Sequence, residues 1–167
     1  GWSFAKEELM ISPGIIPALY ELVGDLLAED EKLLITSPAY GFFLHAAEFN
    51  HRELVCSPLL NDNGNFTIDF EDLERKAADP KVRLLLWCNP HNPTGRMWTK
   101  EETQKVVDIA IKYDLWLISD EIHCDLVRQG LRHIPMGKVM PDYQKLITCM
   151  SASKTFNMAG LMFSDIL

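Results

Sequence analysis

The sequence predicts an α/β fold: a mostly parallel sheet with helices on both faces. Apolar runs of strand length, such as residues 82–88 and 115–119, alternate with segments whose apolar residues recur at helical spacing, such as 15–27. The strand-like runs are apolar almost throughout, which is typical of strands covered on both faces. Alternation of strands with helices favours a layered domain with a largely parallel sheet.

Composition sets the broad class. The chain has 167 residues, 47% hydrophobic and 24% charged, with a formal net charge of -8. The length suffices for one domain with a sizeable core, and Lys and Arg are scattered, which argues against a nucleic-acid surface. No apolar stretch approaches the roughly 20 residues of a membrane span and no signal-peptide pattern opens the chain, so a cytoplasmic location is the expectation.

The four cysteines are far apart in the sequence and lie mostly in or beside apolar runs. Cys56, Cys88, Cys124 and Cys149 form no Cys-x-x-Cys pair and no Cys/His spacing typical of metal sites. We therefore expect buried free thiols in preference to disulfides or a metal centre.

Strand and helix signals follow one another along the chain. Thr99 with Glu102 three residues later forms a capping box that predicts a helix start. The predicted elements are, in order, a strand at 8–12, a helix at 15–27, a strand at 32–36, a helical segment at 44–50, a strand at 53–56, a surface turn at 61–65, a helix at 69–78, a strand at 82–88, a helix from Thr99 through 111, a strand at 115–119, a loop at 135–137 and a strand at 146–150.

Lys154 is the central candidate for chemistry. It follows the apolar run 146–150, just beyond the carboxyl end of a predicted strand, where open α/β sheets bind ligands. A lysine there can be a solvated charge, a phosphate contact or an amine activated for Schiff-base chemistry. Taken alone it favours the solvated charge, but the segments 89–95 and 119–123 upstream reverse that preference.

Other candidates follow other predicted strands. Asn92 lies in a loop whose two prolines and glycine fix the backbone. Tyr40 lies beyond the strand at 32–36, and Asp120 and His123 follow the strand at 115–119. Each also has an ordinary interpretation: core packing for Tyr40, a helix cap for Asp120 and a hydrogen-bonded polar residue for His123.

The turn before the first long helix offers an anion site. Backbone N–H groups of Gly14, Ile15 and Ile16 are expected at the helix start, where they suit a phosphate. A plain strand-to-helix connection explains the same residues equally well. The Ser151 hydroxyl, three residues before Lys154, is a further candidate for a phosphate contact.

Together these residues match the needs of a pyridoxal 5'-phosphate site. A lysine amine forms a Schiff base with the cofactor aldehyde, for which Lys154 is suited. A carboxylate facing the pyridine nitrogen favours the protonated ring, which is an electron sink, and Asp120 fits that role. Asn92 and His123 are neutral donors for the phenolic oxygen, and Tyr40 could stack on the ring.

The motif order resembles that of fold type I pyridoxal phosphate enzymes, the class I and II aminotransferase superfamily. Asn92-Pro93-Thr94-Gly95 is followed by Asp120, 28 residues after Asn92, and by Ser151-x-x-Lys154, with the lysine 34 residues further on. Residues 89–96, 120–123 and 153–157 more narrowly resemble the cystathionine β-lyase-like branch. Members of that branch act as carbon–sulfur lyases or aminotransferases.

The resemblance assigns roles residue by residue. It implies Lys154 as the Schiff-base lysine and proton carrier, and Asp120 at the pyridine nitrogen. Met162 stands where many aminotransferases have a phosphate-binding arginine, so that contact is absent or supplied otherwise. The remaining implied roles are Asn92 near the phenolic oxygen, His123 in place of a common tyrosine, Tyr40 stacked on the ring, and Ser151 with the backbone of Gly14, Ile15 and Ile16 at the phosphate.

The resemblance also bears on extent and assembly. Family members are longer, with an N-terminal segment and a small C-terminal domain that usually brings the arginine for the substrate carboxylate. We therefore expect residues 1–167 to be an incomplete large domain that binds pyridoxal phosphate, within a longer polypeptide. The family implies a homodimer with the site at its interface, although no stretch of this sequence indicates an interface.

Three functions remain open from the sequence. We expect a pyridoxal phosphate-dependent carbon–sulfur β-lyase for a small amino-acid substrate of the cystathionine or cysteine type, with Lys154 removing the α-proton before the β-sulfur group leaves. The first alternative is an aminotransferase, which uses the same residues. The second is a non-catalytic binding or regulatory module with an aminotransferase-like fold.

Overall fold

The computed structural model describes residues 2–167, and its elements are bounded as follows. The strands are β1 (Met10–Ser12), β2 (Lys32–Ser37), β3 (Glu53–Pro58), β4 (Leu60–Asp62), β5 (Asn65–Thr67), β6 (Val82–Cys88), β7 (Trp116–Asp120), β8 (Leu146–Met150) and β9 (Ser164–Ile166). The helices are α1 (Ile15–Leu26), α2 (Gly41–Phe49), α3 (Phe70–Ala77), α4 (Lys100–Lys112), α5 (Met136–Val139) and α6 (Ala152–Thr155), with 3-10 turns η1 (Lys6–Glu8) and η2 (Ala159–Leu161).

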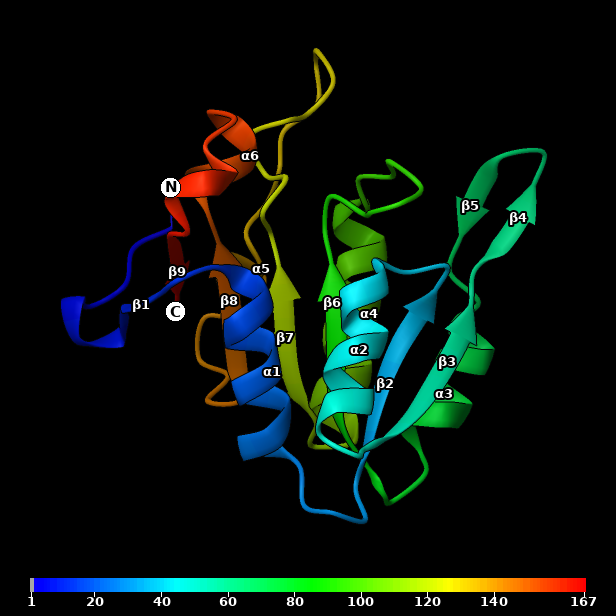
Figure 1. The fold of residues 1–167 in the computed structure, drawn as a ribbon. Helices are drawn as coiled ribbons and strands as arrows, with labels where there is room; N and C mark the ends of the chain where they lie inside the picture. The colour runs from blue at the N-terminus through cyan, green and yellow to red at the C-terminus, as the bar shows by residue number, and fades with distance from the viewer. Residues whose placement is uncertain (1) are drawn as a thin grey trace.

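Within these residues one seven-stranded sheet forms the centre, in the order β1-β9-β8-β7-β6-β2-β3 (Figure 1). The strands from β8 to β3 pair in parallel, whereas β9 runs antiparallel to both β8 and β1. Helices α1 and α2 cover one face, and α3 and α4 cover the other (Figure 1). The predicted α/β class with a mostly parallel sheet is confirmed.

The continuous apolar runs reflect burial on both faces. Successive side chains of a strand point to opposite faces. Leu33 and Ile35 of β2 belong to the same hydrophobic cluster as Leu19 of α1, whereas Leu34 between them belongs to the cluster on the other face, with Val106 of α4. Every position in the middle of β2 must therefore be apolar, and the pattern carries no period of two.

The segment predicted as a surface turn at 61–65 is part of a hairpin. Strands β4 and β5 pair antiparallel through Asp62 and Asn65, with Asn63 and Gly64 between them. Both turn residues have positive φ, 50° for Asn63 and 90° for Gly64. Asn-Gly is a strong signal for such a two-residue hairpin turn, so this dipeptide could have predicted the hairpin from the sequence.

Other differences concern short elements. The strand predicted at 8–12 begins at Met10, because residues 6–8 form a 3-10 turn, and the loop predicted at 135–137 contains the start of α5. Asp120 is the last residue of β7 and caps no helix. Strand β9 was not predicted, because three residues are too few to show a periodic pattern. Its extended conformation comes from pairing with β1 on one side and β8 on the other.

Cys88 and Cys149 are buried free thiols as expected, whereas Cys56 and Cys124 are free but only half-buried.

Among the helices of residues 2–167, none combines the length and the apolar character needed to cross a bilayer.

This core predicts that shortening a buried side chain to alanine lowers the unfolding free energy more than shortening an exposed one. Leu85, fully buried in β6, should lose about 2–5 kcal/mol of unfolding free energy on replacement by alanine, because the cavity left behind adds to the lost transfer energy. Ile111 on α4 is 51% exposed, so Ile111→Ala should cost below about 1 kcal/mol. Urea unfolding of both variants measures the difference, and equal costs would contradict this core.

Candidate active site

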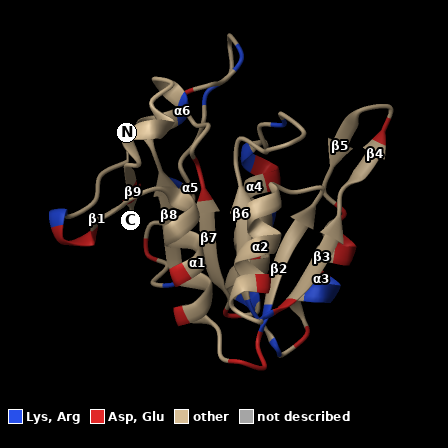
Figure 2. Ribbon diagram, in the orientation of Figure 1, with Lys and Arg blue, Asp and Glu red and all other residues tan. Residues whose placement is uncertain are grey.

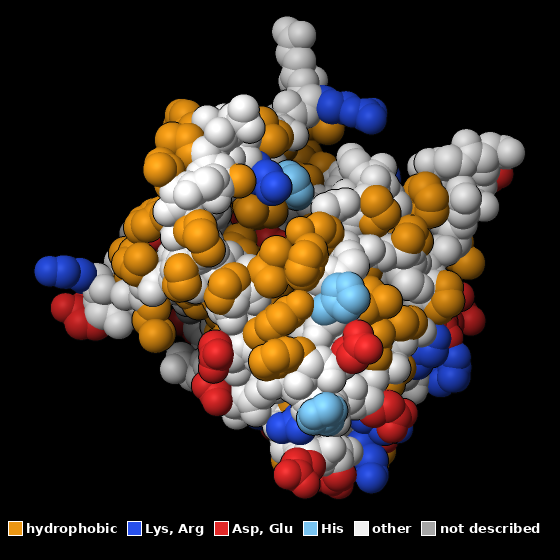
Figure 3. Space-filling model, in the orientation of Figure 1, with side chains coloured by type: hydrophobic (Ala, Val, Ile, Leu, Met, Phe, Trp, Pro, Cys, Tyr) orange, Lys and Arg blue, Asp and Glu red, His pale blue; other side chains and the backbone are white. Residues whose placement is uncertain are grey.

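A cavity of about 330 Å³ opens at the carboxyl edge of the parallel strands. It corresponds to the hollow between α6 and the amino-terminal ends of α1 and α2 (Figure 3). Parallel strands end at the same edge of a sheet, so residues distant in sequence meet there. All nine site residues predicted from the sequence line this cavity: Gly14, Ile15, Ile16, Tyr40, Asn92, Asp120, His123, Ser151 and Lys154.

Asp120 forms the buried acidic end of the cavity. Its register partners are Cys88 on β6 and Cys149 on β8, so the carboxyl group lies between two buried thiol side chains on the same face of the sheet. Its Oδ1 accepts a hydrogen bond from the backbone N–H of Ile122 at 3.1 Å. The side chain is thus fixed in direction but has little polar solvation.

The surroundings of Asp120 alter its proton affinity. The pKa of the carboxyl is raised from 3.8 to about 7, mainly by burial: the Ile122 hydrogen bond and the Lys154 charge lower it, and the charge of Glu121 raises it. The carboxyl can therefore gain or lose a proton near neutral pH. That property suits a group that must share a proton with a basic ring nitrogen.

Lys154 brings a cation to the same cavity. It lies on α6 with an exposed side chain, and its charge acts on both Asp120 and His123. Figure 2 shows the basic position of α6 and the acidic end of β7 at the same edge of the sheet. The next residue, Thr155, donates a hydrogen bond to Asp125 at 2.9 Å, which ties α6 to the segment after β7.

Ser151 caps α6. Its Oγ accepts a hydrogen bond from the Ser153 N–H at 3.1 Å and donates to the Phe163 carbonyl at 2.6 Å. The hydroxyl is therefore already engaged in local contacts. Ser153 also lines the cavity, and its Oγ lies 2.8 Å from Ser151 Oγ. It offers a second hydroxyl at this end of the cavity.

The start of α1 forms an uncapped helix terminus at the cavity wall. Gly14, the N-cap residue, has a φ of 133°, which favours glycine, and it offers no side chain to cap the first turn. Ser12 donates instead to the Gly14 carbonyl at 2.9 Å. Within residues 2–167, no side chain accepts a hydrogen bond from the first-turn N–H groups of Ile15 and Ile16. The helix dipole adds partial positive charge there, which fits an anion.

Two ring side chains complete the cavity in their neutral forms. Burial, with a contribution from the Asp120 charge, raises the pKa of Tyr40, so the phenol keeps its proton. Its ring packs edge-on against Phe43 with centroids 5.9 Å apart. Burial and the Lys154 charge lower the pKa of His123, so a neutral imidazole faces the cavity at neutral pH.

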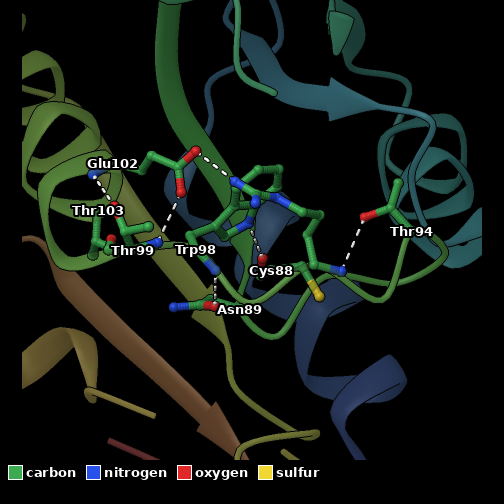
Figure 4. A network of polar contacts seen from close by, with 8 residues as sticks. Cys88, Asn89, Thr94, Trp98, Thr99, Glu102 and Thr103 are labelled. Atoms are coloured by element: carbon green, nitrogen blue, oxygen red, sulfur yellow. Dashed lines mark hydrogen bonds and ion pairs between the residues drawn. The ribbon is translucent and has the colours of Figure 1, made fainter. Parts of the chain in front are cut away.

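Asn92 is positioned by the loop around it, which is anchored at Trp98 (Figure 4). The Trp98 backbone N–H donates to Asn89 Oδ1 at 3.2 Å, and its indole Nε1 donates to the Cys88 carbonyl at 3.0 Å. Buried His91 lies 2.8 Å from Thr94 through Nδ1 and Oγ1. Both ends of the loop are therefore attached to the end of β6.

The capping box predicted at Thr99 and Glu102 is present at the start of α4, and it extends this anchor. Glu102 donates its N–H to Thr99 Oγ1 at 3.1 Å and accepts from the Thr99 N–H at 2.8 Å. Its other oxygen pairs with Arg96 at 2.6 Å, and the Arg96 guanidinium lies 5.0 Å from the Trp98 ring centroid. The loop that carries Asn92 is thus held at both the strand and the following helix.

Comparison with known proteins identifies the family. The family model described as aminotransferase class I and II matches residues 2–162. The chain belongs to the class I and II aminotransferase family. Every predicted site residue lies within the matched range.

Relatives within and around this family include lyases and transaminases. "Cystathionine beta-lyase PatB" of Bacillus subtilis is 39% identical over 168 residues, which is 100% of this chain and 43% of that protein. A pyridoxal phosphate-bound C-S lyase from Staphylococcus hominis superposes with a TM-score of 0.98 at 50% identity, covering 100% of this chain and 43% of that one. Human "Kynurenine--oxoglutarate transaminase 3" is 27% identical, with 93% and 36% covered. The chain spans less than half the length of each.

The cavity of this aminotransferase-family chain also contains residues that sequence analysis missed. Ser164 of β9 lines it, and its buried Oγ has no hydrogen-bond partner within residues 2–167. Ile122 lines it as well and holds Asp120 through its N–H. No local signal marked Ser164, because β9 itself was not predicted, and a backbone donor such as that of Ile122 leaves no mark in the residue type.

The raised pKa of Asp120 predicts a pH-dependent stability. The folded chain keeps this proton up to about pH 7, whereas the unfolded chain releases it near 3.8, so the contribution is present below pH 4 and is lost as pH rises through 7. Asp120→Asn removes this loss. In the cofactor-free protein, the unfolding free energy of the variant relative to that of wild type should therefore rise by about 2–4 kcal/mol from pH 4 to pH 8. Urea unfolding at both pH values checks this, and a constant difference would contradict it.

Proposed function

We propose that this chain carries the cofactor site of a pyridoxal phosphate-dependent carbon–sulfur β-lyase for amino acids of the cystathionine or cysteine type. The observation that carries the proposal is one cavity that brings the Lys154 amine to the buried Asp120 carboxyl. The names of PatB and of the Staphylococcus hominis lyase support the same activity.

The donor set of the cavity fits the parts of the cofactor. The uncapped start of α1, at Gly14, Ile15 and Ile16, offers N–H groups for the phosphate. Neutral Tyr40 offers a ring face, and Asp120 offers a carboxyl whose pKa of about 7 matches a shared proton at the pyridine nitrogen. An anion site, an aromatic surface and an acid therefore line the same cavity.

The remaining roles follow from charge and position. Bound pyridoxal phosphate supplies an electron sink that stabilises the charge left when a substrate Cα–H bond breaks. Lys154 would hold the cofactor through its aldehyde, and its amine, once displaced by the amine of the substrate, would take the Cα proton. Asp120 would keep the ring nitrogen protonated, and Asn92 and neutral His123 would donate hydrogen bonds to the phenolic oxygen. The β-sulfur group would then leave as a thiol, and hydrolysis of the remaining imine by water would give the oxo acid and ammonia.

Transamination is the second candidate. It needs the same lysine and acid, with the proton returned to the cofactor carbon, and the match to human kynurenine–oxoglutarate transaminase 3 favours keeping it. The higher identities to PatB and the Staphylococcus hominis lyase favour elimination. The non-catalytic module stays a third, weaker alternative, because the site retains both the lysine and the acid.

We also propose that residues 1–167 are the large cofactor domain of a longer protein, which pairs with a second copy. Hydrophobic side chains gather over α1 and α2 (Figure 3), and Phe42, Leu44 and Phe49 of α2 are exposed. Exposed apolar patches are commonly covered by a partner. Analytical ultracentrifugation of the protein measures the association.

Attachment of the cofactor tests the site. The protein with pyridoxal phosphate should develop a visible absorption band that borohydride removes, with the label on Lys154 by peptide mass mapping, and Lys154→Ala should lack both. Lys145→Ala is the matched control, because Lys145 lies at the other end of β8 and pairs with Asp114 at 2.6 Å. A label spread over surface lysines would refute the assignment.

Product analysis separates the two reactions. With cystathionine or cysteine, a lyase releases thiol, oxo acid and ammonia without an amino acceptor, so we expect equal amounts of thiol-containing product and oxo acid. Turnover that requires an oxo-acid acceptor and releases no thiol would instead establish transamination. Both reactions should fall by at least about a thousandfold in Lys154→Ala.

A further inference from the structure

We propose that Glu121 and His133 form a buried positioning pair behind the site: the pair holds a fixed negative charge next to Asp120 and anchors the segment that carries His123. Neither residue lines the cavity of the proposed active site. An effect of this pair on a bound cofactor rests on the proposed function. Its effect on the proton affinity of Asp120 does not.

Glu121 lies on the opposite face of the sheet from Asp120, and its side chain is almost wholly enclosed. One oxygen accepts from the Ser119 hydroxyl at 3.0 Å and from the Met136 N–H at 2.8 Å. The other lies 2.6 Å from His133 Nε2, with side-chain exposures of 7% for His133 and 1% for Glu121. A carboxylate buried with three donors is held in one orientation.

The hydrogen bonds of His133 indicate which partner carries the charge. Its Nδ1 is buried and has no hydrogen-bond partner within residues 2–167. A proton on Nδ1 would be a buried donor without an acceptor, which is costly, so the arrangement fits a neutral ring that donates through Nε2. The pair then carries one net negative charge, on Glu121.

That charge acts on Asp120 from behind. The groups that face or adjoin Asp120 come from several elements: the Cys88 thiol of β6, the Cys149 thiol of β8, Tyr40 after β2, neutral His123, Lys154 of α6 and Glu121. Among these, Glu121 is the like charge, and it raises the proton affinity of Asp120. A second carboxylate here also stabilises any cation in the cavity, such as a protonated ring nitrogen.

The same contacts anchor a long irregular segment. Residues 121–135 form turns and loops between β7 and α5 and include His123. The Glu121 side chain reaches forward to His133 and to the first N–H of α5, which closes the segment onto β7. The position of His123 at the cavity therefore depends on a clamp on the far face of the sheet.

The charge is tested by titrating Asp120 in the cofactor-free protein, using carboxyl 13C NMR with the signal assigned by Asp120→Asn. In Glu121→Gln, which keeps size and loses charge, the Asp120 midpoint should fall by about one pH unit. His133→Gln keeps a neutral donor and should titrate like wild type. Glu74→Gln, which removes an equal charge near Lys112, should also leave the midpoint unchanged. An unchanged midpoint in Glu121→Gln, or an equal fall in Glu74→Gln, would overturn the proposal.

The clamp is tested separately by hydrogen exchange, which remains informative if Glu121→Gln folds poorly. His133→Leu removes the donor and should speed exchange at residues 122–135 at least about tenfold relative to the rest of the sheet, whereas His133→Gln should not. Equal protection in His133→Leu and wild type would refute the clamp.

The cofactor-bound protein links the pair to the proposed function. In wild type with pyridoxal phosphate, the pH midpoint of the visible band should be higher than in Glu121→Gln, because loss of a negative charge disfavours cations in the cavity. If the wild-type protein binds no pyridoxal phosphate, the proposed function is contradicted. The NMR titration then still decides whether Glu121 and His133 act on Asp120. A wild type that binds, with identical midpoints in both proteins, contradicts the pair.

Discussion

The burial of one carboxyl group at the end of a central strand is the constraint on which the cavity depends. Asp120 ends β7 with a parallel neighbour on each side, and thiol side chains flank it in register. Such a group has few ways to lower its energy: it can take a proton or face a cation. Lys154 supplies the cation, and β8 delivers it to the same edge because both strands run in parallel.

Rigidity around this carboxyl comes from contacts outside the cavity. The loop that carries Asn92 is attached through Trp98 to the end of β6 and through Glu102 to α4. The segment that carries His123 is attached through Glu121 on the opposite face. Side chains fixed in this way need little reorganisation when a ligand binds, which is what electrostatic preorganisation requires. Sites of this kind therefore depend on residues that never touch the ligand.

Sequence reasoning reached most of the site for a physical reason. Parallel strands covered on both faces leave long apolar runs, and polar residues that follow such runs must meet at one edge, so the sequence alone suffices to group Tyr40, Asn92, Asp120 and Lys154. It missed β9 and the contact between Glu121 and His133. Both depend on pairing between segments that local patterns do not connect, and an acid beside Asp120 looks like any other polar residue.

The distribution of charge along the cavity bears on the position of Met162, where many aminotransferases have an arginine. At the α1 end the donors are N–H groups and serine hydroxyls, with the helix dipole in place of a full cation. At the β7 end the Asp120 carboxyl faces Lys154, and Glu121 adds negative charge from the opposite face of the sheet. The cavity therefore presents partial positive charge at one end and negative charge at the other. Under the proposed function, a ligand with a phosphate at one end and a basic ring nitrogen at the other has the complementary polarity, so the charge distribution favours one orientation of that ligand.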